Sequence, residues 1–75
     1  MKKNQDLFVE VVKLVSNYRN ETHESIMEIS KYLEVSYSTV WKILKGYNDF
    51  SENILNKIKQ RIQILNQILE ETNKY

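Results

Sequence analysis

Apolar residues recur every three or four positions along most of the chain, which is the spacing of one face of a helix. A polar break at residues 20–24, a turn at 34–36 and a loop at 46–51 separate the apolar runs. The pattern predicts an all-α fold with four helices, over about residues 5–19, 26–33, 37–45 and 52–73. The chain has no proline and one glycine, Gly46, so it lacks the turn residues that separate short strands.

Three serines stand where a predicted helix begins. Ser25 precedes the second apolar run, and Glu28 follows three residues later, which is the spacing of a capping box. Ser36 and Ser51 precede the third and fourth runs, where a serine oxygen can accept a backbone N–H of the first turn. Gly46 lies just past the third run, where a residue with left-handed backbone ends a helix.

The last predicted helix carries a heptad seam, whose members are Leu55, Ile58, Ile62, Leu65, Leu69 and Thr72. Ile54, Ile64 and Ile68 widen its apolar face. One interpretation packs the whole seam on the first helix of the same chain. The other leaves Leu55 and Ile58 in the domain core and assigns Ile62 to Leu69 to a homodimer.

We expect the homodimer, because so many isoleucines exceed what one small domain covers. The residues expected to contribute to dimerisation are Leu55, Ile58, Ile62, Leu65, Ile68 and Leu69. The 75 residues form a single expected domain (1–75), near the lower size limit for independent folding, and oligomerisation is one way to support such a domain.

The charge is nearly balanced overall but unevenly distributed. The net charge of +1 and the pI of about 7.9 are low for a nucleic-acid-binding domain. Residues 35–48 carry two basic and no acidic side chains, whereas residues 1–34 have a net charge of −1 and residues 49–75 sum to zero. The only segment with uncompensated positive charge is therefore the third predicted helix and its end.

Several classes of function are excluded by composition. The chain has no cysteine and one histidine, His23, so neither a nucleophilic cysteine nor a set of metal ligands is available, and we expect no metal, no cofactor and no enzymatic activity. No apolar run reaches the length of a membrane span, and the acidic residues Asp6 and Glu10 are untypical of a secretory signal. A chain without cysteine fits a cytoplasmic location.

Two short helices joined by a three-residue turn predict a helix-turn-helix over residues 25–45. In this motif the second helix lies in the major groove of DNA, with its N-terminal residues at the base edges. The third predicted helix has a core side with Val40, Ile43 and Leu44, and Ser38, Lys42 and Lys45 lie roughly opposite. Tyr37 and Trp41, one turn apart, flank the apolar stripe, where they can be partly buried against the first or fourth helix, contact DNA or anchor a protein partner.

Residues 25–65 resemble the headpiece of the lactose-repressor family. The resemblance rests on "SIMEISKYLEVSYSTVWKILKGY" followed by "FSENILNKIKQ", in which "VSYSTV" matches the turn and the start of the recognition helix. By this resemblance, base contacts fall to Tyr37, Ser38 and Lys42, and phosphate contacts fall to Ser25, Ser36 and Thr39. Hydroxyls at helix N-termini suit phosphate oxygens, and lysine can reach guanine acceptors.

Three positions depart from the family pattern. Ser30 stands for the small residue of the second helix, and Trp41 replaces a small polar residue. Glu34 replaces the turn glycine, places a negative charge near the expected phosphate face, and costs about 1 kcal/mol if its backbone is left-handed.

The sequence thus predicts a sequence-specific regulator of transcription, most simply a repressor, that binds double-stranded DNA as a homodimer. The expected DNA-binding residues are Ser25, Ser36, Tyr37, Ser38, Thr39, Trp41, Lys42, Lys45 and Tyr47. The composition, rich in asparagine, lysine and isoleucine, is compatible with an AT-rich bacterial, phage or plasmid origin.

Two alternatives remain open. The helix-turn-helix can serve as a scaffold that docks on a host transcription factor or polymerase through Tyr37, Trp41 and Tyr47. The near-neutral charge, Glu34 and Trp41 favour this alternative. The other alternative is a unit whose only function is dimerisation through the seam of its last helix.

Overall fold

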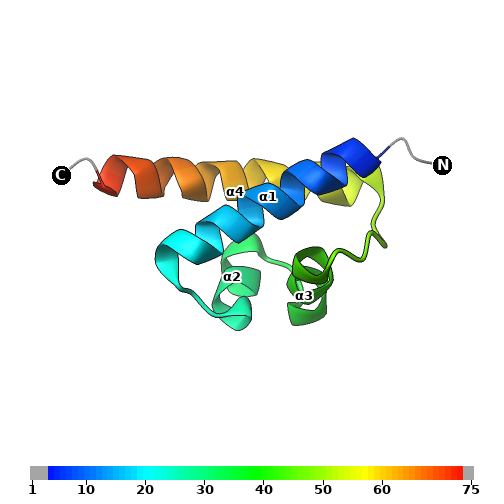
Figure 1. Cartoon of the computed structure of the whole chain (residues 1–75), viewed down its shortest axis with the longest axis horizontal. Coiled ribbons are helices and arrows are strands. Elements are labelled where there is room, and N and C mark those ends of the chain that lie inside the picture. Colours follow the sequence, from blue (N-terminus) through cyan, green and yellow to red (C-terminus); the bar gives the residue numbers. More distant parts are fainter. Residues whose placement is uncertain (1–3, 74–75) are drawn as a thin grey trace.

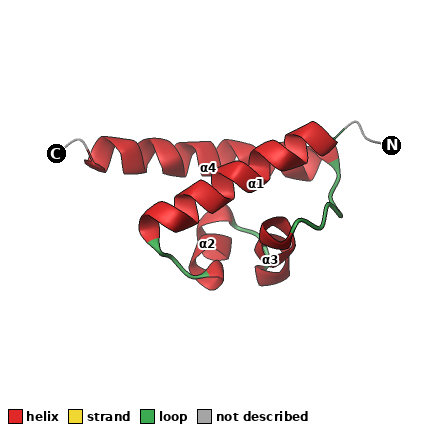
Figure 2. Ribbon diagram, viewed as in Figure 1, coloured by secondary structure: helices red, strands yellow, loops and turns green. Residues whose placement is uncertain are grey.

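The computed structural model describes residues 4–73, which form four helices (Figure 1). The helices are α1 (Gln5–Thr22), α2 (Ile26–Leu33), α3 (Tyr37–Lys45) and α4 (Glu52–Asn73). No strand occurs within this range (Figure 2). The predicted all-α class with four helices is confirmed, and the bounds of the last three helices agree with those expected.

The two long helices, α1 and α4, cross and pack on each other (Figure 1). The two short helices, α2 and α3, lie side by side below them in this view. The last turns of α4 project beyond the other helices, so the described part of the chain is elongated, with extents of 44 × 21 × 18 Å. None of the four helices is long and apolar enough to cross a membrane.

One hydrophobic core joins all four helices. Its buried members are Phe8, Val11, Val15 and Tyr18 of α1, Ile29 and Leu33 of α2, Val40 and Ile43 of α3, and Leu55, Ile58 and Ile62 of α4. Because α2 and α3 contribute only two buried residues each, their position depends on the α1–α4 pair that completes the core.

The seam of α4 belongs to this core for most of its length, which corrects the expected dimer contacts. Leu55, Ile58 and Ile62 are at most 1% exposed, so they have no surface to offer to a second chain. Leu65 and Leu69 are half-buried and pack against the same core. Of the residues expected to contribute to dimerisation, Ile68 alone is mostly exposed, at 54%.

α1 ends three residues later than expected, at Thr22 rather than near residue 19. The polar residues after Arg19 remain helical because they face solvent and because Thr22 Oγ1 donates a hydrogen bond to Tyr18 O at 2.8 Å. His23 then takes a left-handed backbone (φ 59°), and its N–H donates to Arg19 O at 2.7 Å. The helix therefore stops at its C-cap and not at the first polar residue.

The serine caps form as predicted. Ser25, Ser36 and Ser51 each accept a backbone N–H from three residues ahead, at 3.1–3.3 Å. Gly46 has the left-handed backbone expected after α3, with φ 87°. The capping box is only half made, because the Glu28 carboxylate accepts a hydrogen bond from the Tyr32 hydroxyl at 3.4 Å.

The loop between α3 and α4 is tied to the start of α1. Asn4 Nδ2 donates to Phe50 O at 2.7 Å, and Asn48 Nδ2 lies 3.3 Å from Asn4 Oδ1 and 3.2 Å from Gln5 Oε1. The rings of Phe8 and Phe50 stack with centroids 6.4 Å apart. These contacts hold the loop, and with it Tyr47 and Asp49, beside the end of α3.

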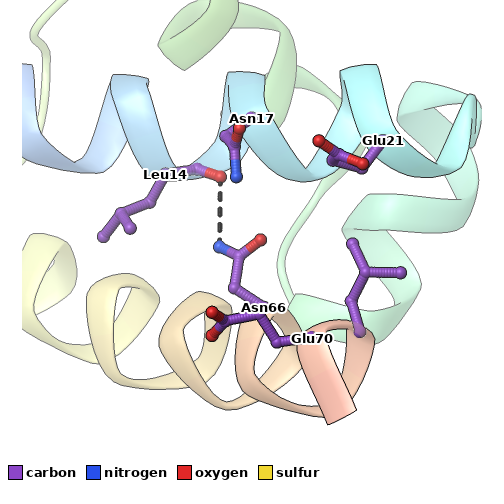
Figure 3. Close-up of a pocket in the computed structure, with 6 residues that line it drawn as sticks. Leu14, Asn17, Glu21, Asn66 and Glu70 are labelled. Atoms are coloured by element: carbon purple, nitrogen blue, oxygen red, sulfur yellow. Dashed lines mark hydrogen bonds between the residues drawn. The ribbon is translucent and has the colours of Figure 1, made fainter. Parts of the chain in front are cut away.

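At the other end of the molecule, α1 and α4 diverge around a small pocket. Asn66 Nδ2 donates to Leu14 O at 3.3 Å and joins the two helices (Figure 3). The pocket of about 350 Å³ is lined by Leu14, Asn17, Glu21, Asn66, Leu69 and Glu70. None of the residues expected to contact DNA lies in it.

Ile62 and Ile64 differ in burial, so replacing each by alanine should lower the free energy of unfolding by different amounts. Ile62 is fully buried, so Ile62→Ala should lower the free energy of unfolding by about 2–5 kcal/mol. Ile64 is 57% exposed, so Ile64→Ala should change it by about 0.5 kcal/mol or less. Urea denaturation of dilute protein, in which chains remain unpaired, measures both values. Equal losses would contradict the assignment of Ile62 to the core.

Candidate nucleic-acid interface

The helix-turn-helix is closed by a tight turn after α2. Glu34 adopts a left-handed backbone with φ 58°, and its N–H donates to Lys31 O at 3.2 Å. The N–H of Val35 then donates to Ser30 O at 3.0 Å, which is the long bond of a Schellman motif. This turn reverses the chain within three residues and starts α3 at Tyr37.

Ser30 shows why a small residue suits this position in α2. It is the one polar side chain that is buried among the described residues, with 5% of its surface exposed. Its hydroxyl donates to Met27 O at 2.7 Å, within its own helix. A buried hydroxyl satisfied in this way lets α2 approach its neighbours without an unpaired polar group.

The negative charge of Glu34 in the turn forms an ion pair with a residue of α4. Arg61 Nη1 lies 3.0 Å from Glu34 Oε2, and both side chains are largely exposed. An exposed ion pair adds little stability, about 0–1 kcal/mol, but it reduces the negative field near the start of α3. Beside this pair, a groove of about 480 Å³ separates the α2–α3 turn from α4.

Three hydroxyls meet at the N-terminus of α3. Ser36 Oγ accepts the backbone N–H of Thr39 at 3.2 Å, and it also lies 2.8 Å from Thr39 Oγ1 and 3.2 Å from Ser38 Oγ. Ser36 and Ser38 are exposed, and Thr39 is half-buried. The positive end of the helix dipole and these donors make this the part of the motif best suited to phosphate oxygens.

The outer face of α3 carries an aromatic group. The rings of Trp41 and Tyr47 stack with centroids 5.8 Å apart and an angle of 23° between their planes. Lys45 Nζ lies 6.0 Å from the Trp41 ring centroid, at the limit of a cation–π contact. Tyr37, one turn before Trp41, is half exposed. Trp41, Tyr47 and Lys45 thus form one group that is partly apolar and positively charged, with Tyr37 on the same helix.

Lys42, the expected base-contacting lysine, has an acidic neighbour. Lys42 Nζ lies 3.1 Å from Asp49 Oδ2, and 72% of the Asp49 side chain is exposed. Asp49 stands one residue beyond the segment without acids, and the tied loop brings it back over α3. Because the pair is exposed, its attraction is small and Lys42 can exchange it for another acceptor.

Ser25 belongs to the start of α2 rather than to α3, and acidic residues flank it in the chain. Its hydroxyl caps α2 and has Glu24 and Glu28 as near neighbours in the chain. The charge of Glu24, then burial, and then the charge and hydrogen bond of Glu28 raise the pKa of Tyr32 above its usual range. This negative field disfavours a phosphate at Ser25, although the sequence resemblance places one there.

The expected absence of a metal site bears on His23 and the carboxylates between Asn4 and Asn73. No group of three histidine, cysteine or carboxylate side chains is placed to hold a metal ion in this range. His23 is exposed at the end of α1, as expected for a solvated loop histidine. Comparisons of the chain with protein-family models, curated proteins and solved structures find no match.

The structure brings together most of the expected DNA-binding residues and adds two that sequence analysis missed. The residues that α3, its N-cap and the following loop hold near one another are Ser36, Tyr37, Ser38, Thr39, Trp41, Lys42, Lys45 and Tyr47, among which Ser36, Ser38 and Thr39 meet, as do Trp41 and Tyr47. The additions are Asp49 and Arg61, which set the charge around Lys42 and Glu34. Only the tertiary fold pairs residues 27 positions apart, so no local pattern signals the Glu34–Arg61 contact.

The turn predicts a difference between two substitutions of Glu34. Glu34→Gln removes the ion pair and keeps the left-handed backbone strain, whereas Glu34→Gly removes both. The glycine variant should therefore be more stable than the glutamine variant by about 1 kcal/mol. Thermal or urea unfolding of the two proteins measures this difference. A less stable glycine variant would contradict the strain assigned to residue 34.

Proposed function

We propose that this protein is a sequence-specific DNA-binding regulator of transcription, most simply a repressor, which places α3 in the major groove. The observation that carries the proposal is the α2–α3 motif itself. A Schellman turn joins two short helices, and the second helix buries Val40 and Ile43 while it presents its other side to solvent. An α-helix held in this manner has the size that the major groove admits.

The proposed contacts divide between bases and phosphates. Tyr37, Ser38 and Lys42 face the base edges, where lysine can bind guanine O6 and N7 and the tyrosine ring can contact a thymine methyl group. Ser36, Thr39 and Lys45 are assigned to phosphates, because hydroxyls at a helix N-terminus and a flanking lysine fix the register on the backbone. Trp41 and Tyr47 cover the adjoining surface.

Lys42 has to leave Asp49, 3.1 Å away, before it contacts a base. The cost is small because the pair is exposed. At a guanine in the correct register Lys42 exchanges that partner for two acceptors on one base. Asp49 also reduces the positive charge that α3 offers to phosphates, in a chain whose net charge is only +1.

A repressor of this kind acts in the cytoplasm of a bacterial cell by covering a promoter that polymerase would otherwise occupy. Helix-turn-helix proteins commonly do so as dimers on two half-sites about one helical turn apart. A homodimer of this chain fits that scheme, since one copy offers only one recognition helix.

The proposal is tested by selection from randomised duplex DNA. Purified protein should enrich one sequence, in two inverted half-sites, and its affinity should fall steeply with salt. The slope of log K against log salt is about −0.9 for each neutralised phosphate, so the titration counts the phosphate contacts. An absence of enrichment, together with no binding near physiological salt, would overturn the proposal.

That negative outcome would favour the second candidate, a helix-turn-helix scaffold that docks on a transcription factor or polymerase. The stacked Trp41 and Tyr47 rings support this candidate, because exposed tryptophan and tyrosine are frequent anchors of protein interfaces. Pull-down of a purified polymerase, lost with Trp41→Ala and kept with Lys59→Ala, would support it, since Lys59 pairs with Glu10 of α1.

The base-contacting role of Lys42 has its own test. Lys42→Ala should weaken binding to the selected sequence by about 1–3 kcal/mol and relax the preference at one base pair. Lys59→Ala is the matched control, because Lys59 pairs with Glu10 of α1 at 2.7 Å and has no place at α3. Fluorescence titration against the selected site and its single-base variants measures both. An equal loss on every sequence would leave Lys42 a phosphate contact only.

A further inference from the structure

A second row of side chains runs along α4 beside the buried seam. Its members are Ile54, Lys57, Arg61, Ile64, Ile68 and Glu71, which follow one another at steps of three and four residues. We call this row the outer seam. Arg61 is half-buried and the other five residues are exposed, including Ile64 at 57% and Ile68 at 54%. Such spacing keeps one stripe on one side of a helix and suits contact with a second helix.

The charges of the outer seam are arranged about its centre. Ile64 has Lys57 seven residues before it and Glu71 seven residues after it. At a rise of 1.5 Å per residue, the positive and negative side chains lie about 10 Å on either side of Ile64. The segment from Ile62 to Leu69 between them carries no charge. The row is therefore basic at one end, apolar in the middle and acidic at the other end.

We propose that α4 pairs with α4 of a second copy of this chain in antiparallel orientation, centred on Ile64. In this arrangement Ile64 meets Ile64 of the second copy, and Lys57 of each copy faces Glu71 of the other. Arg61 lies beside Ile68 of the second copy, where its aliphatic stem covers the isoleucine while its guanidinium remains with Glu34. The contact is self-complementary, as a two-fold dimer requires.

The charges favour the antiparallel over the parallel orientation. In a parallel pair each residue of the outer seam faces its own copy, so Lys57 would meet Lys57 and Glu71 would meet Glu71, which is unfavourable. Lys57 and Glu71 of one chain do not reach each other, because 14 residues of the same helix separate them by about 21 Å. In an antiparallel pair each of the two faces an opposite charge on the second copy.

The outer seam is accessible along its length. The last turns of α4 project past α1, α2 and α3 (Figure 1). Near Lys57 the α2–α3 turn does not close over α4, since the groove of about 480 Å³ separates them there. Burial of four isoleucines from two copies, Ile64 and Ile68 of each, would give the isolated end of α4 the tertiary packing that short helices need in water.

The proposal rests on α4 alone and does not require DNA binding, so its test is done without DNA. Analytical ultracentrifugation of the full chain should show a particle of twice the 9.0 kDa of one chain. Lys57→Glu and Glu71→Lys should each raise the dimer Kd about tenfold, because each turns two attractive contacts into repulsive ones. Both residues are exposed, so both variants should keep their helical circular dichroism spectrum.

Mixing the two variants gives the decisive result. A heterodimer of Lys57→Glu with Glu71→Lys has opposite charges at both ends again, and its Kd should return to within about twofold of the unmodified protein. Glu70→Lys is the matched control, since Glu70 lies next to Glu71 in the chain but off the outer seam, and it should leave the Kd unchanged. Failure of the mixture to recover, or a monomer at millimolar concentration, would overturn the proposal.

The outcome is separable from that of the DNA selection. Charge-dependent pairing without an enriched DNA sequence would leave the dimer standing and remove the proposed function. An enriched single half-site bound by a monomer would support the proposed function and remove the dimer.

Discussion

The contact between α1 and α4 is the interaction on which the rest of the structure depends. α2 and α3 are eight and nine residues long, too short to be stable alone in water, and each buries two apolar residues. Val11 and Val15 of α1, with Leu55, Ile58 and Ile62 of α4, supply the surface on which they pack. The direction of the outer face of α3 is therefore set by residues buried in the core.

Two ion pairs compensate charge at the helix-turn-helix. Arg61 of α4 reaches Glu34 in the turn, and Asp49 of the following loop reaches Lys42 on α3. The Asp49 contact exists because Asn4 and Phe8 of α1 hold that loop through Asn48 and Phe50. Long-range attraction for DNA is accordingly small, and binding through α3 would depend more on shape and hydrogen bonds than on net charge.

Local signals predicted the elements well where one residue decides the boundary. The serine caps marked where α2, α3 and α4 begin, and Gly46 marked where α3 ends. Each of these residues acts within one turn of its own position. The prediction failed at the end of α1, where a polar run was mistaken for a break although helix exteriors are polar too. The clustering of Ser36, Ser38 and Thr39 was predictable from the cap, whereas the partners of Lys42 and Glu34 depend on tertiary contacts.

The same reasoning explains the error in α4. A heptad seam shows that one face of a helix is covered, but it does not show whether the cover is its own chain or another. Here the seam from Leu55 to Leu69 packs into the core of its own chain, chiefly against α1, and the adjacent row with Ile64 and Ile68 is left to solvent. The two rows differ in one respect visible in the sequence. The core seam contains no charged residue, whereas the outer seam carries Lys57, Arg61 and Glu71. A charge inside a domain core is costly, but at the rim of an interface between copies it selects orientation, so the mixed row is the one suited to a partner.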